Sequence, residues 1–446
     1  MLKNGSKNDT TKFTCDQDKM ITEEFFSAVY GPPLSSNTAI AKDVGIYAHS
    51  LWPTFAPKST FRKSAAPPHC LAVSDTHVFA AQHEKAYVHV YSRLRGNQEA
   101  FVAFPEKIRC VALAGDVLVL GTVEGRIMLW ETCTGRLVSL PPSHVQAISC
   151  IATTPYHFLT GSDDSNVHVW SLARLLELDS NEEQEPTVSF SNHRGAITDL
   201  AVSSGDNPET SLCVSASKDK TCIIWNYRSG EVLRTLLFPT FPLCLALDPC
   251  ACAVYVSTDQ GSIYAVDFFG SKPLLGPKSD ESSTVVQVAT AFCTAPAGSG
   301  PATCLGLAHD GTTLLSGHPK GQIHAWSITD KSASSGVKEL TNLNAAITNI
   351  IFVAPLAPAA PVVKAWTVVK PSQVQRTYTF SAQFDADLAP ETRFTTMVQT
   401  PGFDRETLDS MIAAYLEPKT DESGDKETRQ RIQRQWEILD QLTASS

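Results

Sequence analysis

Short runs in which hydrophobic and polar residues alternate are spread along most of the chain. A period of two fits β-strands that are buried on one face, and it does not fit helices. Successive groups of such runs each end in an aromatic residue or a substitute for one, at Tyr91, Trp130, Trp170, Trp225, Val266 and Trp326. The pattern therefore predicts an all-β protein that is built from a repeated unit.

A second feature repeats with the strands. The first strand of each unit carries a cysteine at its centre, or Asp199 or Asn349 in the same place, so that the position recurs at 70, 110, 150, 199, 244, 304 and 349. The first spacings are close to the 40 or so residues of a WD40 blade of four antiparallel strands. Seven first strands predict a seven-bladed WD40 β-propeller, with the repeated cysteines buried near its axis.

The two ends of the chain are predicted to close the propeller together. The seventh unit is incomplete after VKAWTVV (363–369), and GIYAHSL (45–51) has the pattern of a third strand. Closure of the last blade by N-terminal strands would leave no open sheet edge. We expect a disordered tail over 1–19, the propeller over 20–400 and a C-terminal helical extension over 403–446.

The C-terminal extension has helical periodicity. FDRETLDSMIAAYLE (403–417) begins near Asp404, a candidate N-cap, and stops at Pro418. A second helix near the end of the chain has one apolar face, formed by Ile432, Trp436, Leu439 and Leu442. A helix this short is marginal alone in water. The apolar face is expected either to pair with another chain, as a self-association helix, or to pack on its own propeller.

Two insertions interrupt the repeat. The segment 171–190 carries an acidic loop, which is either a solvated loop or a docking loop for a basic partner; its acidic residues are Glu177, Asp179, Glu182, Glu183 and Glu185. The segment 268–302 contains one strand-like run, TVVQVA.

The stretch GSDDSNVHVW (161–170) places two carboxylates beside His168, which suggests acid–base chemistry when read alone. The repeat suggests a structural network instead. In a WD40 blade the third-strand tryptophan binds a Ser or Thr of the second strand, which binds a histidine held by a turn aspartate. The residues that fit this pattern in two successive blades are His144, Asp164 and Trp170, with Thr160 or Ser162, and His193, Asp219 and Trp225, with Ser215 or Ser217.

The other blades depart from the pattern. Glu124 and Lys320 occupy the aspartate position before Trp130 and Trp326, and Tyr91 and Val266 replace the tryptophan. The sequence therefore predicts the full network in two blades only. Asp163 is predicted to be an exposed neighbour of Asp164 with no structural role.

Composition excludes several classes of function. The net charge is −10 with a pI of 5.6, so no autonomous nucleic-acid binding is expected. The 12 cysteines form no CxxC pair, and the closest cluster, Cys244, Cys250 and Cys252, lacks a matching His or Cys pair, so no metal site is expected. Free thiols indicate a reducing compartment. No membrane segment, cofactor motif or catalytic motif is recognisable, which favours a non-enzymatic protein.

Several stretches in order resemble one family. They are TEEFFSAVYGPP, GIYAHSLWP, FRKS and VHVWSLARLLEL, together with the helical tail. In these stretches the chain resembles the fungal WD-repeat pre-rRNA-processing family. Proteins of that family are subunits of the Rix-type complex, which acts in the maturation of the large ribosomal subunit (pre-60S) and in the processing of the second internal transcribed spacer.

The resemblance implies a non-catalytic scaffold in the nucleus, in the nucleoplasm or nucleolus. Its implied partners are the Rix-type helical-repeat subunit, bound by the propeller, and the pre-60S particle and the midasin AAA ATPase, reached through the complex. It also implies a homodimer through the C-terminal helix and, for some members, an association with chromatin. The alternative from the sequence is a generic WD40 adaptor, such as a ubiquitin-ligase substrate receptor or a modified-peptide reader.

Overall fold

The structure is a computed structural model, and it describes residues 23–31, 34, 44–177, 184–203, 210–270, 273–276, 285–329, 337–353, 368–371 and 433. The chain divides into two compact units, Met1–Phe380 and Ser381–Ser446, and every described residue except Gln433 belongs to the first unit. The tail 1–19, most of the acidic loop, the extension 403–417 and the apolar face at Ile432, Trp436, Leu439 and Leu442 lie outside the described residues.

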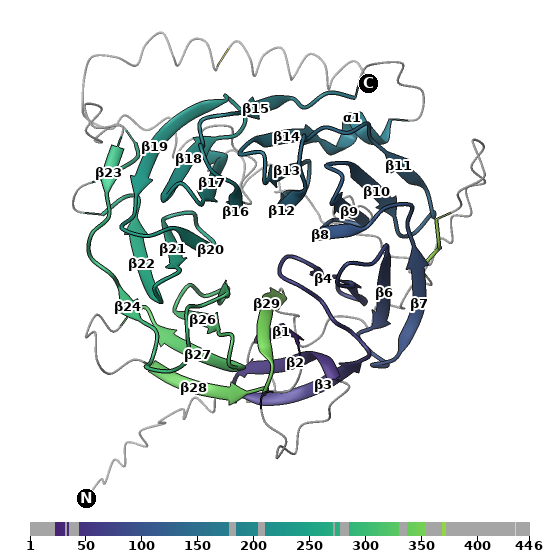
Figure 1. The fold of residues 1–446 in the computed structure, drawn as a ribbon, viewed down its shortest axis with the longest axis horizontal. Helices are drawn as coiled ribbons and strands as arrows, with labels where there is room; N and C mark the ends of the chain where they lie inside the picture. The colour runs from purple at the N-terminus through teal and green to yellow at the C-terminus, as the bar shows by residue number, and fades with distance from the viewer. Residues whose placement is uncertain are drawn as a thin grey trace, which may run out of the picture. The chain divides into compact units, whose positions relative to one another are not determined.

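The first unit is a ring of seven antiparallel sheets, as the repeat predicts (Figure 1). We number the blades from the first complete one. Blade 1 comprises β4 (Leu71–Val73), β5 (His77–Ala81), β6 (Tyr87–Ser92) and β7 (Gln98–Ala103). Blade 2 comprises β8 (Ile108–Ala114), β9 (Val117–Thr122), β10 (Ile127–Glu131) and β11 (Leu137–Ser139). Blade 3 comprises β12 (Ile148–Thr153), β13 (His157–Ser162), β14 (Val167–Ser171) and β15 (Val188–Phe190), with the short helix α1 (Leu172–Leu176).

The remaining blades follow the same plan with two adaptations. Blade 4 comprises β16 (Ile197–Val202), β17 (Leu212–Ser217), β18 (Thr221–Asn226) and β19 (Glu231–Leu237). Blade 5 comprises β20 (Pro242–Leu247), β21 (Ala253–Thr258), β22 (Ser262–Asp267) and β24 (Cys293–Thr294). Blade 6 comprises β25 (Cys304–Leu307), β26 (Thr313–Gly317), β27 (Gln322–Ser327) and β28 (Val337–Asn342). The strand-like run of the second insertion forms β23 (Val285–Gln287), which pairs in parallel with β19 as a fifth strand of blade 4.

Blade 7 is closed by both ends of the chain. Its strand order is β29-β1-β2-β3, from β29 (Ala346–Val353), β1 (Glu23–Tyr30), β2 (Val44–Trp52) and β3 (Ala56–Arg62). The predicted closure is confirmed, and three of the four strands come from the N-terminal side. The prediction that 363–369 continues this blade is wrong for its described part: Val369 binds blade 2 instead. The second strand of blade 7 is β1, which is largely buried and pairs with β29 on one side and β2 on the other.

The recurring position of the first strands joins neighbouring blades around the axis. At five of the seven positions the side chain hydrogen-bonds the backbone of the next blade, and the bonds are Cys70 Sγ to Arg109 O, Cys110 Sγ to Ile148 O, Leu245 N to Asp199 Oδ2, Cys244 Sγ to Ala302 O and Asn349 Nδ2 to Pro67 O. Burial raises the pKa of Cys70 to about 12, so its thiol keeps the hydrogen that it donates. The predicted burial of the repeated cysteines is confirmed. We call this set of contacts the blade clasp.

The blade clasp requires a small residue on the adjoining second strand. The residues that face the seven positions are Ala81, Gly121, Gly161, Ala216, Ser257, Gly317 and Ala28. A Cβ added to Gly161 would lie 2.7 Å from Ile197 Cγ2 of the next blade and 2.9 Å from Cys150 Sγ. The small residue therefore makes the space into which the next blade inserts its isoleucine.

Gly161→Val should destabilise the propeller, because the added methyl groups overlap Ile197 and Cys150. Overpacking of this kind costs about 2 kcal/mol, measured as the free energy of unfolding in urea. Gly270→Val is the matched control, since its added Cβ meets only ordinary contacts, 3.5 Å from Asp267 Cβ. Equal stability of the two variants would contradict the role assigned to the small residue.

Candidate functional site

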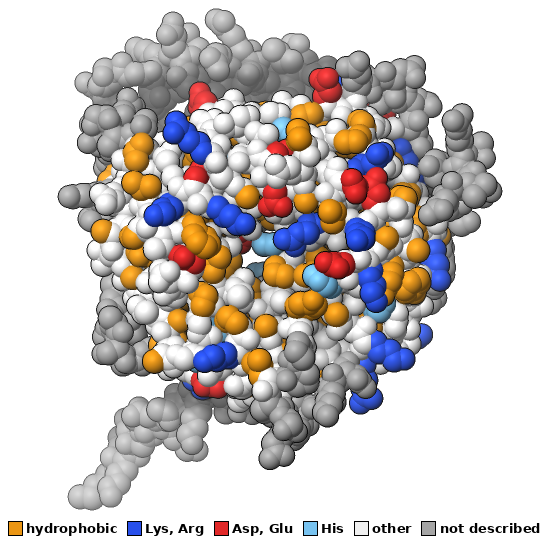
Figure 2. Space-filling view, in the orientation of Figure 1, with side chains coloured by type: hydrophobic (Ala, Val, Ile, Leu, Met, Phe, Trp, Pro, Cys, Tyr) orange, Lys and Arg blue, Asp and Glu red, His pale blue; other side chains and the backbone are white. Residues whose placement is uncertain are grey.

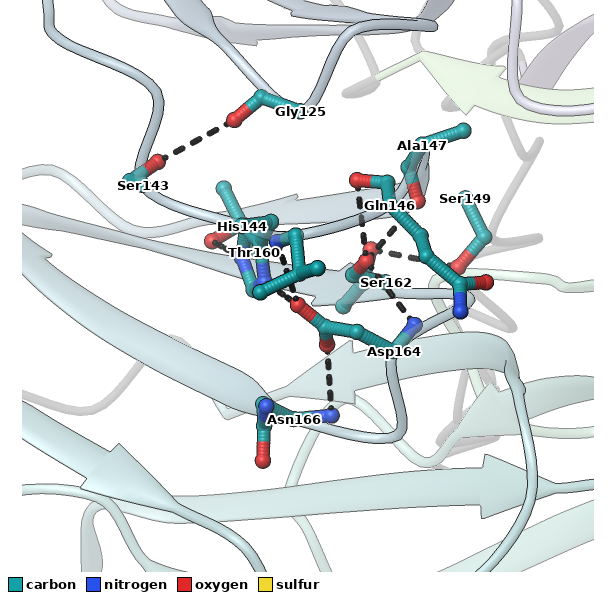
Figure 3. Close-up of polar contacts among 12 residues, drawn as sticks. Gly125, Ser143, His144, Gln146, Ala147, Ser149, Thr160, Ser162, Asp164 and Asn166 are labelled. Atoms are coloured by element: carbon teal, nitrogen blue, oxygen red, sulfur yellow. Dashed lines mark hydrogen bonds and ion pairs between the residues drawn. The ribbon is translucent and has the colours of Figure 1, made fainter.

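The stretch that suggested acid–base chemistry forms the turn and third strand of blade 3 (Figure 3). Trp170 Nε1 donates to Thr160 Oγ1 over 3.1 Å, and Thr160 Oγ1 lies 2.9 Å from His144 Nε2. His144 Nδ1 lies 3.1 Å from Asp164 Oδ2. If the indole donates to Thr160, the hydroxyl hydrogen is left for His144 Nε2, and Nδ1–H then donates to the carboxylate. Each polar group in this series of hydrogen bonds has its partner within blade 3.

Asp164 is held as a carboxylate by these contacts. Burial raises its pKa, but the hydrogen bonds from His144 and from the backbone N–H groups of Asn166 and Val145 outweigh burial and lower the pKa to about 2. A group with this pKa remains ionised at neutral pH and has no proton to give. The prediction that Asp163 is exposed is wrong: it is half-buried, because its backbone N–H donates to Ala147 O in the loop before the first strand.

His168, the residue that raised the question of catalysis, stacks on the network. Its ring lies 4.2 Å from the ring of His144, at an angle of 26°. Burial and the neighbouring His144 lower its pKa to about 4, so the ring is neutral at pH 7. Its Nδ1 is buried and has no hydrogen-bond partner among the described residues. His168 therefore packs as a neutral ring against the imidazole of His144.

Blade 4 repeats the arrangement. Trp225 Nε1 donates to Ser215 Oγ over 2.8 Å, Ser215 Oγ lies 2.7 Å from His193 Nε2, and His193 Nδ1 lies 3.1 Å from Asp219 Oδ2. Asp219 also accepts hydrogen bonds from the backbone and the hydroxyl of Thr221, and the bonds from His193 and Thr221 lower its pKa although burial opposes this. Of the serine alternatives, the structure selects Ser215.

Blade 6 contains a third network that the sequence did not predict. Trp326 Nε1 donates to Ser316 Oγ over 2.8 Å, and Ser316 Oγ lies 2.9 Å from His318 Nε2, whose Nδ1 lies 2.9 Å from Gly300 O. The histidine comes from the end of the second strand, and a backbone carbonyl replaces the missing aspartate. A signal was present: Ser316, like Thr160 and Ser215, stands ten residues before its tryptophan.

Blade 2 satisfies its tryptophan in another way. Trp130 has Leu120 ten residues before it, and leucine cannot accept a hydrogen bond. Its Nε1 instead donates to Val369 O over 3.0 Å, and Val369 N donates to Thr132 O over 2.9 Å. Gly135 leaves room for this segment, because a Cβ there would lie 2.7 Å from Val369 Cγ1. We call residues 368–371 the strap.

Blades 1, 5 and 7 use other contacts at the tryptophan position or beside it. The hydroxyl of Tyr91 donates to Arg62 O over 2.9 Å, and Val266 joins an apolar cluster. In blade 7, Ser27 Oγ lies 3.0 Å from His49 Nε2, and burial lowers the pKa of His49 to about 4. The Tyr91 bond joins blade 1 to β3 of blade 7, whereas Ser27 and His49 both belong to blade 7.

A central channel with a volume of about 340 Å³ lies among the described residues. It is lined by the first strands of the blades, and its lining includes His69, Asp199, Cys244 and Cys304. Burial raises the pKa of Asp199, which accepts the backbone N–H groups of Leu200 and Leu245 and lies 3.7 Å from His69 Nδ1. Asp199 thus acts in the blade clasp, as a carboxylate where other blades have a thiol.

The cysteine cluster from the sequence does not come together. Cys244 is buried at the channel, whereas Cys250 and Cys252 are exposed in the turn before β21. Within the part of the chain that the structure describes, no group of three or more His, Cys, Asp or Glu side chains could hold a metal ion. In the same part, no helix is long and apolar enough to cross a bilayer.

Comparison with known proteins agrees with this architecture. The family model "WD domain, G-beta repeat" matches residues 135–171 and 184–226, which include the residues of the two full networks. The chain is 29% identical to the pre-rRNA-processing protein IPI3 of Yarrowia lipolytica and 29% identical to human WD repeat-containing protein 18, over 59% and 61% of its length. It is 26% identical to the Arabidopsis thaliana protein ROOT INITIATION DEFECTIVE 3, over 60% of its length.

The chain spans about three fifths of the length of these relatives: 62% of the Yarrowia and human proteins and 60% of the Arabidopsis protein. Among solved structures, it resembles the computationally designed Ika8 protein with a TM-score of 0.50 and 16% identity, over 73% of this chain and 96% of that one. At this identity the likeness concerns the fold alone. The predicted resemblance to the WD-repeat pre-rRNA-processing proteins is confirmed.

Asp164→Ala should lower the free energy of unfolding by about 2 kcal/mol, since it leaves buried donors unpaired. Asp163→Ala should change it by less than about 0.5 kcal/mol. Urea unfolding measures both. Because the folded pKa of Asp164 is about 2 and its ordinary value is 3.8, the difference between wild type and Asp164→Ala should be complete above about pH 4 and shrink as the pH falls towards 2. A larger loss for Asp163→Ala would refute the assignment.

Gly135→Ala should destabilise the protein and release the strap. Gly230 supplies the control, because it has a similar φ (+80° against +76°) but its added Cβ meets only Val188 Cγ1 at 3.4 Å. The left-handed backbone disfavours alanine by about 1 kcal/mol at both sites. Only Gly135→Ala should therefore show further destabilisation and faster hydrogen exchange at Val369. Identical behaviour of the two variants would show that the strap does not depend on this contact.

Proposed function

We propose that this WD-repeat propeller, a relative of the pre-rRNA-processing proteins, is a non-catalytic scaffold in the maturation of the large ribosomal subunit and in rRNA internal-spacer processing. The observation that carries the proposal is the similarity to the fungal pre-rRNA-processing proteins and to the animal WD repeat-containing protein 18, whose alignments each cover about three fifths of the chain. Ribosome maturation of this kind places the protein in the nucleus, in the nucleoplasm or nucleolus.

The geometry supports a scaffold better than an enzyme. The histidines and aspartates of the two full networks are bound to each other and to buried hydroxyls, as His144–Asp164 and His193–Asp219. General acid–base catalysis requires such a group within hydrogen-bond reach of a substrate. Here the groups connect strands within a blade, and their role is structural.

The partners are proposed from the same family. The propeller would bind the Rix-type helical-repeat subunit, and the complex would reach the pre-60S particle and the midasin AAA ATPase. The C-terminal helix, through Ile432, Trp436, Leu439 and Leu442, would pair two copies of the chain. An amphipathic helix of this length gains stability mainly by burying its apolar face against a partner.

A generic WD40 adaptor is the second candidate. A reader of methylated peptides holds its ligand in a cage of aromatic side chains. The described residues that line the channel are mostly aliphatic residues, cysteines and threonines. This lining favours the scaffold.

Affinity purification of the tagged full chain from the native organism tests the function. We expect large-subunit precursor proteins and a helical-repeat partner of the Rix type to co-purify, identified by mass spectrometry. Recovery of cullins or methyltransferases in their place would contradict the scaffold and favour the adaptor.

The same preparation tests self-association. The full chain should have twice the mass of one copy by light scattering, and a chain that ends at Pro418 should have the mass of one copy, because it lacks the apolar face at 432–442. A Trp436→Ala variant should weaken the dimer without shortening the chain, since buried aromatic residues dominate interfaces. An unchanged mass after truncation would contradict pairing through this helix.

A further inference from the structure

One end of the propeller is formed by the loops that precede the first strands and by the turns between second and third strands. Antiparallel strands of one blade bring these two connections to the same end. The WD networks join them there, since His144 and His193 lie in the loops and Asp164 and Asp219 in the turns. We call this end of the propeller the network rim.

The networks fix the backbone of the network rim and present two side chains to solvent. Asp164 Oδ2 accepts the N–H of Val145 over 3.0 Å, and Asp219 Oδ2 accepts the N–H of Arg194 over 2.9 Å. Val145 is nevertheless 90% exposed, and Arg194 is exposed. A surface whose backbone is already fixed loses little conformational entropy when it binds a partner.

The turns of blades 3 and 4 have the same backbone but different flanking residues. Ser165 and Lys220 have φ of +71° and +69°, so the two turns match. Around the network aspartate, blade 3 carries Asp163 and Ser165, whereas blade 4 carries Lys218 and Lys220, both exposed. The network needs only the aspartate, and the flanking positions are free to take up a binding role.

Positive charge gathers at the blade 4 part of the network rim, where Arg194, Lys218 and Lys220 are exposed, although the protein has a net charge of −10. Besides Arg126, which pairs with Glu106 over 2.8 Å, the rim carries basic residues that have no ion pair within the described residues: Lys85, Lys107, Arg109, Arg194, Lys218, Lys220 and Lys320. Lys and Arg side chains form a band across the middle of the face drawn in Figure 2, with hydrophobic side chains among them. The rest of the rim also carries acidic residues, among them Glu84 and Glu124, so it is the unpaired positive charge of blade 4 that would attract a partner of the opposite sign.

We propose that the network rim of blades 3 and 4 binds an acidic segment of a protein partner. Arg194, Lys218 and Lys220 would pair with its carboxylates, and Val145 would contact an apolar side chain of the segment. The proposal goes beyond the scaffold function and does not depend on it, because it rests on the surface alone.

Protein is favoured over nucleic acid as the partner by two features. Single-stranded nucleic acids are bound on exposed aromatic side chains beside a basic groove. The exposed aromatic side chains of the described residues lie in other turns or in an outer strand, at Trp52, Phe101, Tyr156 and Phe269. The rim also carries exposed Glu124 and the half-buried Asp163, which would repel a continuous phosphate backbone.

Fluorescence anisotropy with a fluorescein-labelled peptide rich in Glu and interspersed with Leu tests the proposal on the full chain. The wild type should bind the peptide, with an affinity that falls as salt rises. The double variant Lys218→Glu/Lys220→Glu should lose about tenfold or more in affinity, because two attractive charges become repulsive. Val145→Ala should lose less, about threefold, through the lost apolar contact.

The control is Arg95→Glu/Lys338→Glu, which makes the same change of charge at exposed positions away from the network rim. It should bind the peptide as the wild type does, and thermal unfolding should show all variants folded. Absence of peptide binding by the wild type at low salt, or an equal loss in both double variants, would overturn the proposal. Tighter binding of a single-stranded oligouridine probe that Lys218→Glu/Lys220→Glu abolishes would also overturn it, in favour of RNA.

Discussion

The blade clasp is the constraint on which the propeller depends. A blade buries both faces against its neighbours, and nothing within a single blade fixes where the next one begins. The clasp supplies this at five of the seven first strands by a side chain that hydrogen-bonds the backbone of the next blade, as Cys70 does to Arg109 and Asn349 does to Pro67. Since the contact lies at the axis, where the strands are most crowded, only small residues fit opposite it. The ring closes because the last contact returns to the first blade.

The need to pair buried polar groups explains the hydrogen-bonded histidine networks of blades 3, 4 and 6. A buried indole N–H, hydroxyl or imidazole must find a partner, because an unpaired polar group in the interior costs about 1–3 kcal/mol. Blades 3 and 4 satisfy this with the full network, and blade 6 does so with Gly300 O in place of an aspartate. Once these groups are paired, the network makes no use of the side chains that flank its aspartates. Blades 3 and 4 differ at those positions, with Asp163 and Ser165 in one and Lys218 and Lys220 in the other.

Much of the fold could be predicted from the sequence because its strands repeat at regular, short spacings along the chain. The period of two indicated strands, the third-strand aromatics indicated a repeated unit, and the recurring position at 70–349 indicated seven blades; each of these signals depends on residues close together in the chain. The networks of blades 3 and 4 followed from the same spacings. The network of blade 6 was missed because the prediction required a histidine in the loop and an aspartate in the turn, whereas the physical requirement is only an acceptor for Trp326 and a partner for that acceptor.

The strap shows what local patterns cannot reveal. Val369 lies 239 residues from Trp130 in the sequence, and the pairing between them leaves no periodic trace. The need for it was visible all the same: Leu120 stands where the indole of a WD40 blade expects a hydroxyl. A missing acceptor inside a repeated geometry implies that another part of the chain provides one. In a diverged repeat protein, the blades that lack the motif are therefore the places to expect contacts from segments outside the repeat, and blade 2, with its tryptophan but no hydroxyl, received one.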